Sequence, residues 1–382
     1  MDHFGSIQTP IMFYLNETSN NMKHVYLLPR LWCAAVMAIV MAISLAMTGC
    51  QTMHSPSTNI SSTSLQSSTS LPKVIATAPT NLPHMDARQL SGKLIFIYLT
   101  GFGENRQGQL IETQIDGSNP KTLYKVNGTI MSLSASRLGD RLIFTVQAGK
   151  SYPQVVILDR ATLQVTEISG VSGVSGVSDV SAVSAKRTHN FSGAISPDGR
   201  QLLLANSQMG NPEIFLTDSS GNIKQQLTHQ PAIDLAPVWL PDGKSFIFTS
   251  DKAKFLQPQL YQYHFAKQQF LPLNLPGKTN AIARVSPSGR LITYVSDNSQ
   301  GRLTDMATKK SIAINDEGLA EPANFSPDGN YLLYSAKNRI KITPVPNFER
   351  LAPQQSPVSW TIEFADSNHQ PFTIREPIWV NY

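Results

Sequence analysis

The 382-residue sequence predicts an all-β fold, a propeller of six four-stranded antiparallel blades closed by the C-terminal strand. Three observations support this prediction. A short turn phrase recurs along the chain, strand-like apolar runs follow each copy, and the last residues repeat a strand found earlier. The clear copies contain the turn residues Pro197, Asp198, Gly199, Pro241, Asp242, Gly243, Pro287, Gly289, Pro327, Asp328 and Gly329.

The turn phrase, best seen as SPDG at residues 196–199, has a physical logic. Proline has a φ that suits the second position of a type I turn, aspartate can bond its own backbone, and glycine takes the positive φ that follows. The runs after the turn, such as 201–205 and 245–249, are short and rich in strand-forming residues. Each copy is therefore predicted to be a tight hairpin.

The spacing of the repeats predicts the number of blades. The turn glycines of six copies are Gly92, Gly139, Gly199, Gly243, Gly289 and Gly329. Successive intervals are 47, 60, 44, 46 and 40 residues, and the longest one holds a low-complexity insertion at 169–185. Four strands in about 40–50 residues is typical of a propeller blade, so six glycines indicate six blades.

The C-terminus predicts how the ring closes. Residues 376–382 read EPIWVNY and repeat the Pro-x-Trp strand that ends at Trp239. The first copy begins at Gly92 without a comparable innermost strand. We predict that the last strand, with Pro377 and Trp379, pairs with residues 93–98 and closes the ring, so that no sheet edge stays open there.

The N-terminal residues 1–50 are predicted to be a targeting segment. A positively charged start is followed by an apolar run over 31–47, as in a secretory signal. Residues 47–50, MTGC, resemble the bacterial lipobox, which implies cleavage before Cys50 and lipidation of its thiol. Gln51 then implies the outer membrane. A single transmembrane anchor is the alternative, and Met22 is an alternative start.

Residues 51–88 are rich in Ser, Thr and Pro, and we expect a disordered tether there, because such a composition buries too little apolar surface to fold. The propeller then occupies 89–382. No cysteine follows Cys50, so this part has no disulfide framework and no thiolate metal site. The net charge of +5 is not gathered into a basic cluster, so nucleic acid is not an expected partner. We expect a monomer.

The repeats resemble those of the TolB propeller family, which belongs to the periplasmic Tol–Pal system. The copy that matches best combines Pro197-Asp198-Gly199 with Ile214-Phe215 and the closing Leu227-Thr228. The resemblance covers about 89–382. It implies a periplasmic protein partner such as a Pal-type peptidoglycan-associated lipoprotein. The α/β domain that precedes the propeller in that family has no counterpart here, so the resemblance implies no TolA contact.

A search for catalytic or metal-binding residues yields no site. Residues 170–173, GVSG, fall short of a nucleophile elbow. The glycine-rich stretch 100–108 joins two predicted strands, so a hairpin loop is favoured over a phosphate site. The periodic turn aspartates are assigned to structure, Trp239 and Trp379 to core packing. The scattered histidines are expected to bind no metal; they are His189, His229, His264 and His369.

The sequence therefore predicts a non-catalytic protein-binding scaffold, with no cofactor and no metal, anchored by lipid on Cys50 in the periplasm of a Gram-negative bacterium. An enzyme or small-ligand binder with its site in the central channel is the alternative. Charged side chains that converge from three or more blades would favour this alternative.

Overall fold

The computed structural model describes residues 71–79, 91–149, 151–168, 190–207, 210–297, 300–314, 321–336, 338–348, 359–366 and 371–381. The chain divides into two compact units, Met1–Ala42 and Ile43–Tyr382, and every described residue belongs to the second. The predicted signal segment, Cys50 and the insertion at 169–185 lie outside the described residues. Within the described ranges, no helix has the length and apolar character needed to span a bilayer.

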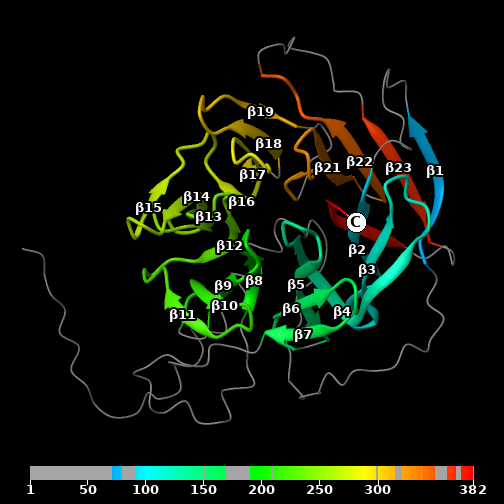
Figure 1. Cartoon of the computed structure of the whole chain (residues 1–382), viewed down its shortest axis with the longest axis horizontal. Coiled ribbons are helices and arrows are strands. Elements are labelled where there is room, and N and C mark those ends of the chain that lie inside the picture. Colours follow the sequence, from blue (N-terminus) through cyan, green and yellow to red (C-terminus); the bar gives the residue numbers. More distant parts are fainter. Residues whose placement is uncertain are drawn as a thin grey trace, which may run out of the picture. The chain divides into compact units, whose positions relative to one another are not determined.

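The described residues form five antiparallel sheets (Figure 1). Three have four strands each, in sequential order: β8 (Asn190–Ile195), β9 (Gln201–Asn206), β10 (Glu213–Asp218) and β11 (Ile223–Gln226); β12 (Asp234–Trp239), β13 (Ser245–Ser250), β14 (Gln259–His264) and β15 (Gln269–Pro272); β16 (Asn280–Val285), β17 (Leu291–Ser296), β18 (Gln300–Asp305) and β19 (Ser311–Ala313). These three sheets confirm the predicted meander of four antiparallel strands per repeat.

The two larger sheets contain strands from both ends of the described chain. One has the order β1-β23-β22-β21-β20, from β1 (Lys73–Pro79), β20 (Asn324–Phe325), β21 (Tyr331–Ala336), β22 (Arg339–Pro344) and β23 (Trp360–Ala365). The other has the order β24-β2-β3-β4-β5-β6-β7, from β2 (Lys93–Thr100), β3 (Gln107–Gln114), β4 (Lys121–Ala135), β5 (Arg141–Ala148), β6 (Gln154–Asp159), β7 (Val165–Ile168) and β24 (Phe372–Val380). Between β2 and β3 lies the 3-10 turn η2 (Gly103–Asn105), so the stretch 100–108 is a hairpin loop, as predicted.

The seven-stranded sheet turns a corner inside β4. Residues 121–127 of this strand pair with β3, whereas residues 128–135 pair with β5. The corner residue is Gly128, whose φ is +153°. A Cβ at this position would lie 2.0 Å from the carbonyl oxygen of Gln147 on β5. Because Gly128 has no side chain, β4 can pair with β3 along its first part and with β5 along its second part.

We expect Gly128→Ala to destabilise the fold by about 3 kcal/mol or more, because the backbone of β5 must move to avoid the new methyl group. Gly243→Ala is the matched control. Gly243 also has a positive φ, of +66°, but a Cβ there meets nothing within 4 Å. This control is expected to cost only about 1 kcal/mol, the strain of the left-handed region. Urea unfolding of both variants measures the difference, and equal losses would contradict this account of the corner.

The innermost strands pack against one another around a common axis (Figure 1). Going round, β4 contacts β8, β8 contacts β12, β12 contacts β16, and β16 contacts β20. The last strand, β24, contacts both β20 and β4. β24 also pairs with β2 along its length, from Lys93 opposite Val380 to Thr100 opposite Phe372.

The hydrophobic core lies between facing sides of neighbouring sheets. One cluster joins Ile143 and Val155 to Leu202 and Leu204, and so fixes the β5–β6 layer against β9. The strands in the middle of each sheet are buried on both faces, which explains their continuous apolar sequences, as in LIFIY of β2. The outermost strands β11 and β15 contain no fully buried residue.

The repeated turns lie between the first and second strands. The N–H of each turn glycine donates to the carbonyl three residues earlier over 2.8–3.0 Å, at Gly139, Gly199, Gly243, Gly289 and Gly329. Asp198 accepts from the Ser196 hydroxyl over 2.6 Å and from the N–H of Arg200 over 3.1 Å, and these bonds hold its pKa below the usual range. Ser288 replaces aspartate in the fifth copy, at 3.1 Å from the Ser286 hydroxyl.

The prolines of these turns lie next to the turns of the following sheet. A Cβ at Gly289 would be 3.4 Å from the ring of Pro241, and one at Gly329 would be 3.4 Å from the ring of Pro287. Asp328 repeats the bonding of Asp198, with the Ser326 hydroxyl at 2.5 Å. Asp242 accepts from the N–H of Lys244 over 2.9 Å.

One expectation about the tether is wrong. Residues 73–79 were expected to be disordered within 51–88, but they form β1 and pair with β23, with Lys73 opposite Ala365 and Pro79 opposite Trp360. The stretch KVIATAP is less polar than its surroundings and contains β-branched residues, which favour a strand. The outer edge of β23 supplies the hydrogen-bonding partner that composition alone does not reveal.

Candidate functional site

A cluster of charged side chains lies on the innermost strands. We call Arg284, Glu321, Asn324, Arg375 and Glu376 the inner-strand network. Arg284 comes from β16, Glu321 and Asn324 from the start of the sheet that contains β20, and Arg375 and Glu376 from β24. Three sheets thus contribute to one cluster, which is the convergence that favours a ligand site.

Ion pairs and hydrogen bonds connect the members of this network. Arg284 donates from Nη2 to Glu376 over 2.7 Å and from Nε to the side-chain oxygen of Asn324 over 3.1 Å. Arg375 forms an ion pair with Glu321, which also accepts from the backbone N–H of Glu376 over 2.8 Å. Glu376 accepts in addition from the N–H of Leu133 over 3.0 Å. The network therefore links β4, β16, β20 and β24.

Burial and charge oppose each other inside the network. Burial raises the pKa of Glu376, and Glu321 raises it further, whereas Arg284 and Arg375 lower it; the net shift is upward. Burial acts to lower the pKa of Arg375, but Glu321 and Glu376 outweigh it and raise that pKa. The side chain of Arg375 is 21% exposed.

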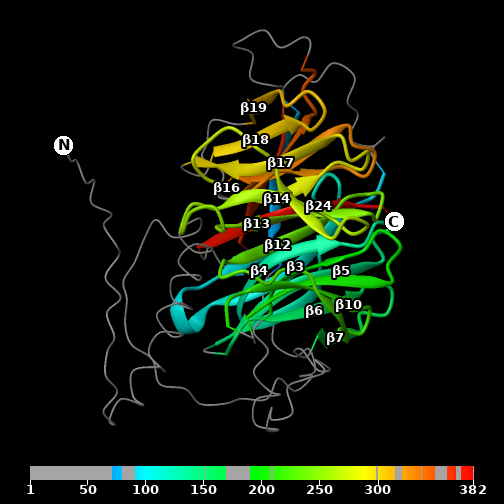
Figure 2. The same ribbon diagram turned by 90° about the vertical axis from the view of Figure 1, so that its left-hand side faces the viewer.

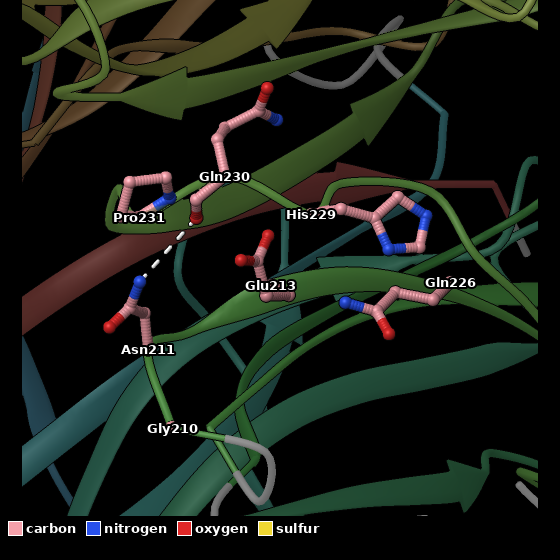
Figure 3. A pocket seen from close by; sticks show the side chains of 7 residues that line it. All are labelled: Gly210, Asn211, Glu213, Gln226, His229, Gln230 and Pro231. Atoms are coloured by element: carbon pink, nitrogen blue, oxygen red, sulfur yellow. Dashed lines mark hydrogen bonds between the residues drawn. The ribbon is translucent and has the colours of Figure 1, made fainter. Parts of the chain in front are cut away.

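A second polar cluster lies where two sheets meet, below a small cavity of about 400 Å³. The cavity is lined by Gly210, Asn211, Glu213, Gln226, His229, Gln230 and Pro231. Figure 3 shows the Glu213 carboxyl pointing toward the loop that carries His229 and Gln230. Across the mouth, the Asn211 side chain donates to the carbonyl of Gln230 over 3.4 Å (Figure 3).

Glu213 and Asp234 form a buried acidic pair at the floor of this cavity. The Thr228 hydroxyl donates to Glu213 over 2.5 Å. Asp234 is fully buried, and neither of its oxygens has a hydrogen-bond partner of good geometry among the described residues, although the Ser250 hydroxyl lies close enough to lower its pKa. Burial, reinforced by Asp234, raises the pKa of Glu213 to about 8, and burial also raises the pKa of Asp234. Both carboxyl groups therefore hold a proton to a higher pH than exposed carboxyl groups do.

The next pair of sheets shows the neutral version of this arrangement. Asn280 begins β16 as Asp234 begins β12, and Gln259 begins β14 as Glu213 begins β10. Here the side chain of Asn280 donates directly to Gln259 over 2.9 Å. The acidic pair therefore occupies positions of the repeat where the next pair of sheets has two hydrogen-bonded amides.

Of the residues singled out in the sequence, His229 lines the cavity and Pro377 lies beside the inner-strand network, whereas the two tryptophans belong to the core. Trp239 and Trp379 are buried, and their indole N–H groups donate to the carbonyls of Ala194 and Ser91 over 3.3 and 2.9 Å. The carbonyl of Pro377 accepts from Asn324 over 3.0 Å, so Pro377 lies beside the inner-strand network. His229 and His264 lie on different elements.

His189, His369 and Cys50 lie outside the described residues. No three His, Cys, Asp or Glu side chains group as a metal ion would require, within the ranges that the structure describes.

Sequence reasoning did not identify the inner-strand network or the acidic pair. Glu376 directly precedes Pro377 in the recognised strand EPIW. Asp234 lies three residues before Pro237, the proline of the earlier Pro-x-Trp strand. A position-by-position comparison of the repeats would have shown that Asp234 stands at the position equivalent to Asn280. It would also have shown Glu213 at the position equivalent to Gln259. The convergence of Arg284 with Glu376 depends on the packing of β16 and β24 in space and left no signal in the sequence.

The fold and the repeats together define a β-propeller protein built from antiparallel four-stranded sheets. The chain belongs to the family described as TolB beta propeller domain, which matches residues 88–345.

Curated relatives are similar over part of their length. The "Tol-Pal system protein TolB" of Helicobacter pylori (strain ATCC 700392 / 26695) is 28% identical over 161 residues, which cover 40% of this chain and 36% of that protein. The "Protein TolB homolog" of Chlorobium chlorochromatii is 29% identical over 151 residues, 39% of this chain and 30% of that protein. These matches thus span about a third of each relative.

Among solved structures, TolB from Acinetobacter baumannii superposes with a TM-score of 0.59 and 25% sequence identity. The superposition covers 76% of this chain and 67% of that one. This similarity agrees with the family match and supports the assignment of the sheets to a TolB-type propeller.

Proposed function

We propose that this chain is a non-catalytic protein-binding scaffold of the cell envelope, related to the Tol–Pal system. The observation that carries the proposal is the match of the TolB propeller family to residues 88–345, together with the similarity to a solved TolB structure. A propeller presents a rigid surface whose loops vary independently, so binding needs no catalytic group. The expected partner is a Pal-type peptidoglycan-associated lipoprotein in the periplasm, and the chain acts as a monomer.

The proposal includes six blades in one ring. Dividing β4 at Gly128 gives six groups of four strands, with β1 as an additional strand on the last group. In this arrangement β24 supplies the innermost strand of the first blade and closes the ring through Pro377 and Trp379. The pairing of β24 with β2, and its contacts with β4 and β20, support this closure.

The proposal also places the chain at the outer membrane through lipid on Cys50, after removal of a signal segment over 1–50. The support is the sequence MTGC at 47–50, with Gln51 following. Growth with an alkyne fatty acid should label the protein, and Cys50→Ser should abolish the label because the acceptor thiol is lost. Cys33→Ser is the matched control and should keep it. Labelling that survives Cys50→Ser would contradict the anchor.

A pull-down tests the scaffold role. The full chain serves as bait in solubilised envelope, and mass spectrometry identifies what it retains. Specific enrichment of a Pal-type lipoprotein is the expected result. A control bait that carries residues 1–88 on an unrelated soluble protein removes partners of the N-terminal segment. A result in which both baits retain the same proteins would argue against a propeller-borne partner site.

The inner-strand network supports a second candidate function, a small-ligand site at the axis. Charged side chains from three sheets converge there, and Arg375 is partly exposed. Native mass spectrometry of the chain purified from cells should then show a bound small molecule that Arg375→Gln loses. Arg290→Gln, which removes the ion pair between the largely exposed Arg290 and the buried Asp305, should retain it. A wild-type chain without added mass would exclude this candidate.

A further inference from the structure

One end of the sheets carries the connections between second and third strands, and we call it the loop face. It comprises the loops 101–106, 149–153 and 251–258, of which Lys150 is outside the described residues. The innermost strands begin at this end, since the N–H of Asn280 at the start of β16 donates to the carbonyl of Pro258 over 2.8 Å. The repeated turns lie at the opposite end, where a Cβ at Gly139 would contact Val380 at the end of β24. Figure 2 shows the η2 coil and the end of β24 on opposite sides.

The loop face displays large apolar side chains at separate tips. Phe102 is 69% exposed, Tyr152 45%, Phe255 61% and Leu256 47%. They come from three different groups of strands, so they form several points and no single contiguous patch. The repeated turns lie at the opposite end. Among the described residues, the turn that contains Leu138 is the only one of them that exposes a large apolar side chain.

The loop 251–258 is held in the conformation that exposes its apolar residues. The Asp251 carboxylate accepts from the N–H of Ile233 over 2.8 Å and from the N–H of Leu256 over 3.2 Å. Leu256 has a φ of +58°, a strained value for a residue with a branched side chain. Such strain persists where the surroundings enforce it and is common at functional sites. The hydrogen bonds of Asp251 therefore hold the loop in a conformation in which Phe255 and Leu256 are exposed to solvent.

Basic residues flank these tips. Lys252 and Lys254 precede Phe255, and the Lys252 ammonium lies 3.6 Å from the centroid of the Phe270 ring. Arg106 ends the loop that carries Phe102, where Glu104 is the acidic counterpart. Lysines beside exposed aromatic and leucine side chains suit a bilayer surface, because the apolar groups enter the interface while the ammonium groups stay at the headgroups. Protein interfaces, in contrast, are depleted in lysine.

We infer that the loop face binds an anionic lipid surface, with Phe102, Tyr152 and the Phe255–Leu256 pair entering the interface and Lys254 contacting the headgroups. Separate apolar tips at one end of the sheets suit a planar surface such as a bilayer. This inference does not depend on lipidation of Cys50 or on the identity of a protein partner.

Bromolipid quenching of introduced tryptophans tests the inference. The full chain is reconstituted in phosphatidylcholine vesicles that contain about 30% phosphatidylglycerol, and the emission added by Phe255→Trp or Phe102→Trp is followed. Both replacements keep an aromatic side chain at an exposed position, so the fold should be retained. Brominated acyl chains should reduce the added emission by about twofold or more.

Leu271→Trp is the matched control, because Leu271 is 52% exposed but lies on the outer strand β15. Its added emission should stay unquenched. Quenching at position 255 should weaken in the Lys254→Glu chain, owing to repulsion by the anionic lipid. An unquenched Phe255→Trp, equal quenching of Leu271→Trp, or unchanged quenching with Lys254→Glu would each overturn the inference. The pull-down above uses none of these variants, so the two proposals fail separately.

Discussion

A chain that ends at Pro377 should lose most of its stability, because the deleted residues include three buried side chains. Ile378, Trp379 and Val380 are 4–8% exposed. Trp379 also stacks on Tyr331, with ring centroids 5.9 Å apart. At about 2 kcal/mol for each large apolar side chain removed from the core, the loss is roughly 6 kcal/mol. That amount is comparable to the whole stability of many domains.

Urea unfolding and gel filtration measure this effect. A chain that ends at Val380 is the matched control, because it keeps every residue of β24 that pairs with β2. It should unfold at nearly the wild-type denaturant concentration. A chain ending at Pro377 that unfolds at the same concentration as this control would contradict the proposed closure of the ring.

The acidic pair should make stability fall as the pH rises. The pKa of Glu213 is about 8 in the folded chain and near 4.5 in the unfolded one. Between these values the folded state keeps a proton that the unfolded state releases, so the free energy of unfolding decreases with increasing pH. Over the whole window the expected decrease is on the order of 5 kcal/mol, and Asp234, whose pKa is also raised, acts in the same direction.

Glu213→Gln should flatten this dependence, because the amide has no proton to lose and can donate to Asp234. Urea unfolding at pH 5 and pH 8.5 measures the slope of the free energy of unfolding for both chains. The Asn280–Gln259 pair offers the reciprocal variant, Gln259→Glu with Asn280→Asp, which should steepen the slope. A slope that neither change affects would show that the folded state holds no additional proton on this pair in this pH range.

Local features of the fold were predictable because they depend on residues that are adjacent in the sequence. The turn at 196–199 follows from the φ of Pro197, the side chain of Asp198 and the positive φ of Gly199. The stretch that contains η2 could be assigned to a hairpin because apolar runs lie on both sides of it. The pairing partner of β24 was predicted from the repeated Pro-x-Trp strand.

Features that depend on distant residues were not predictable in the same way. The strand β1 forms because β23 has a free outer edge, and the two segments lie almost 300 residues apart in the sequence. The shared strand β4 requires the close approach of Gly128 to Gln147, and its glycine does not belong to the repeated turn. Arg284 and Glu376 meet only because their strands stand near the same axis.

The position of β1 determines which hydrogen bonds first bear a force that is applied on the N-terminal side of the chain. A force applied before Lys73 reaches the hydrogen bonds between β1 and β23 first, at the rim of a sheet. The pairing of β2 with β24 lies after β1 along the chain and is not loaded until β1 has detached. Under force β1 can therefore detach from β23 and pair with it again while the pairing of β2 with β24 stays intact.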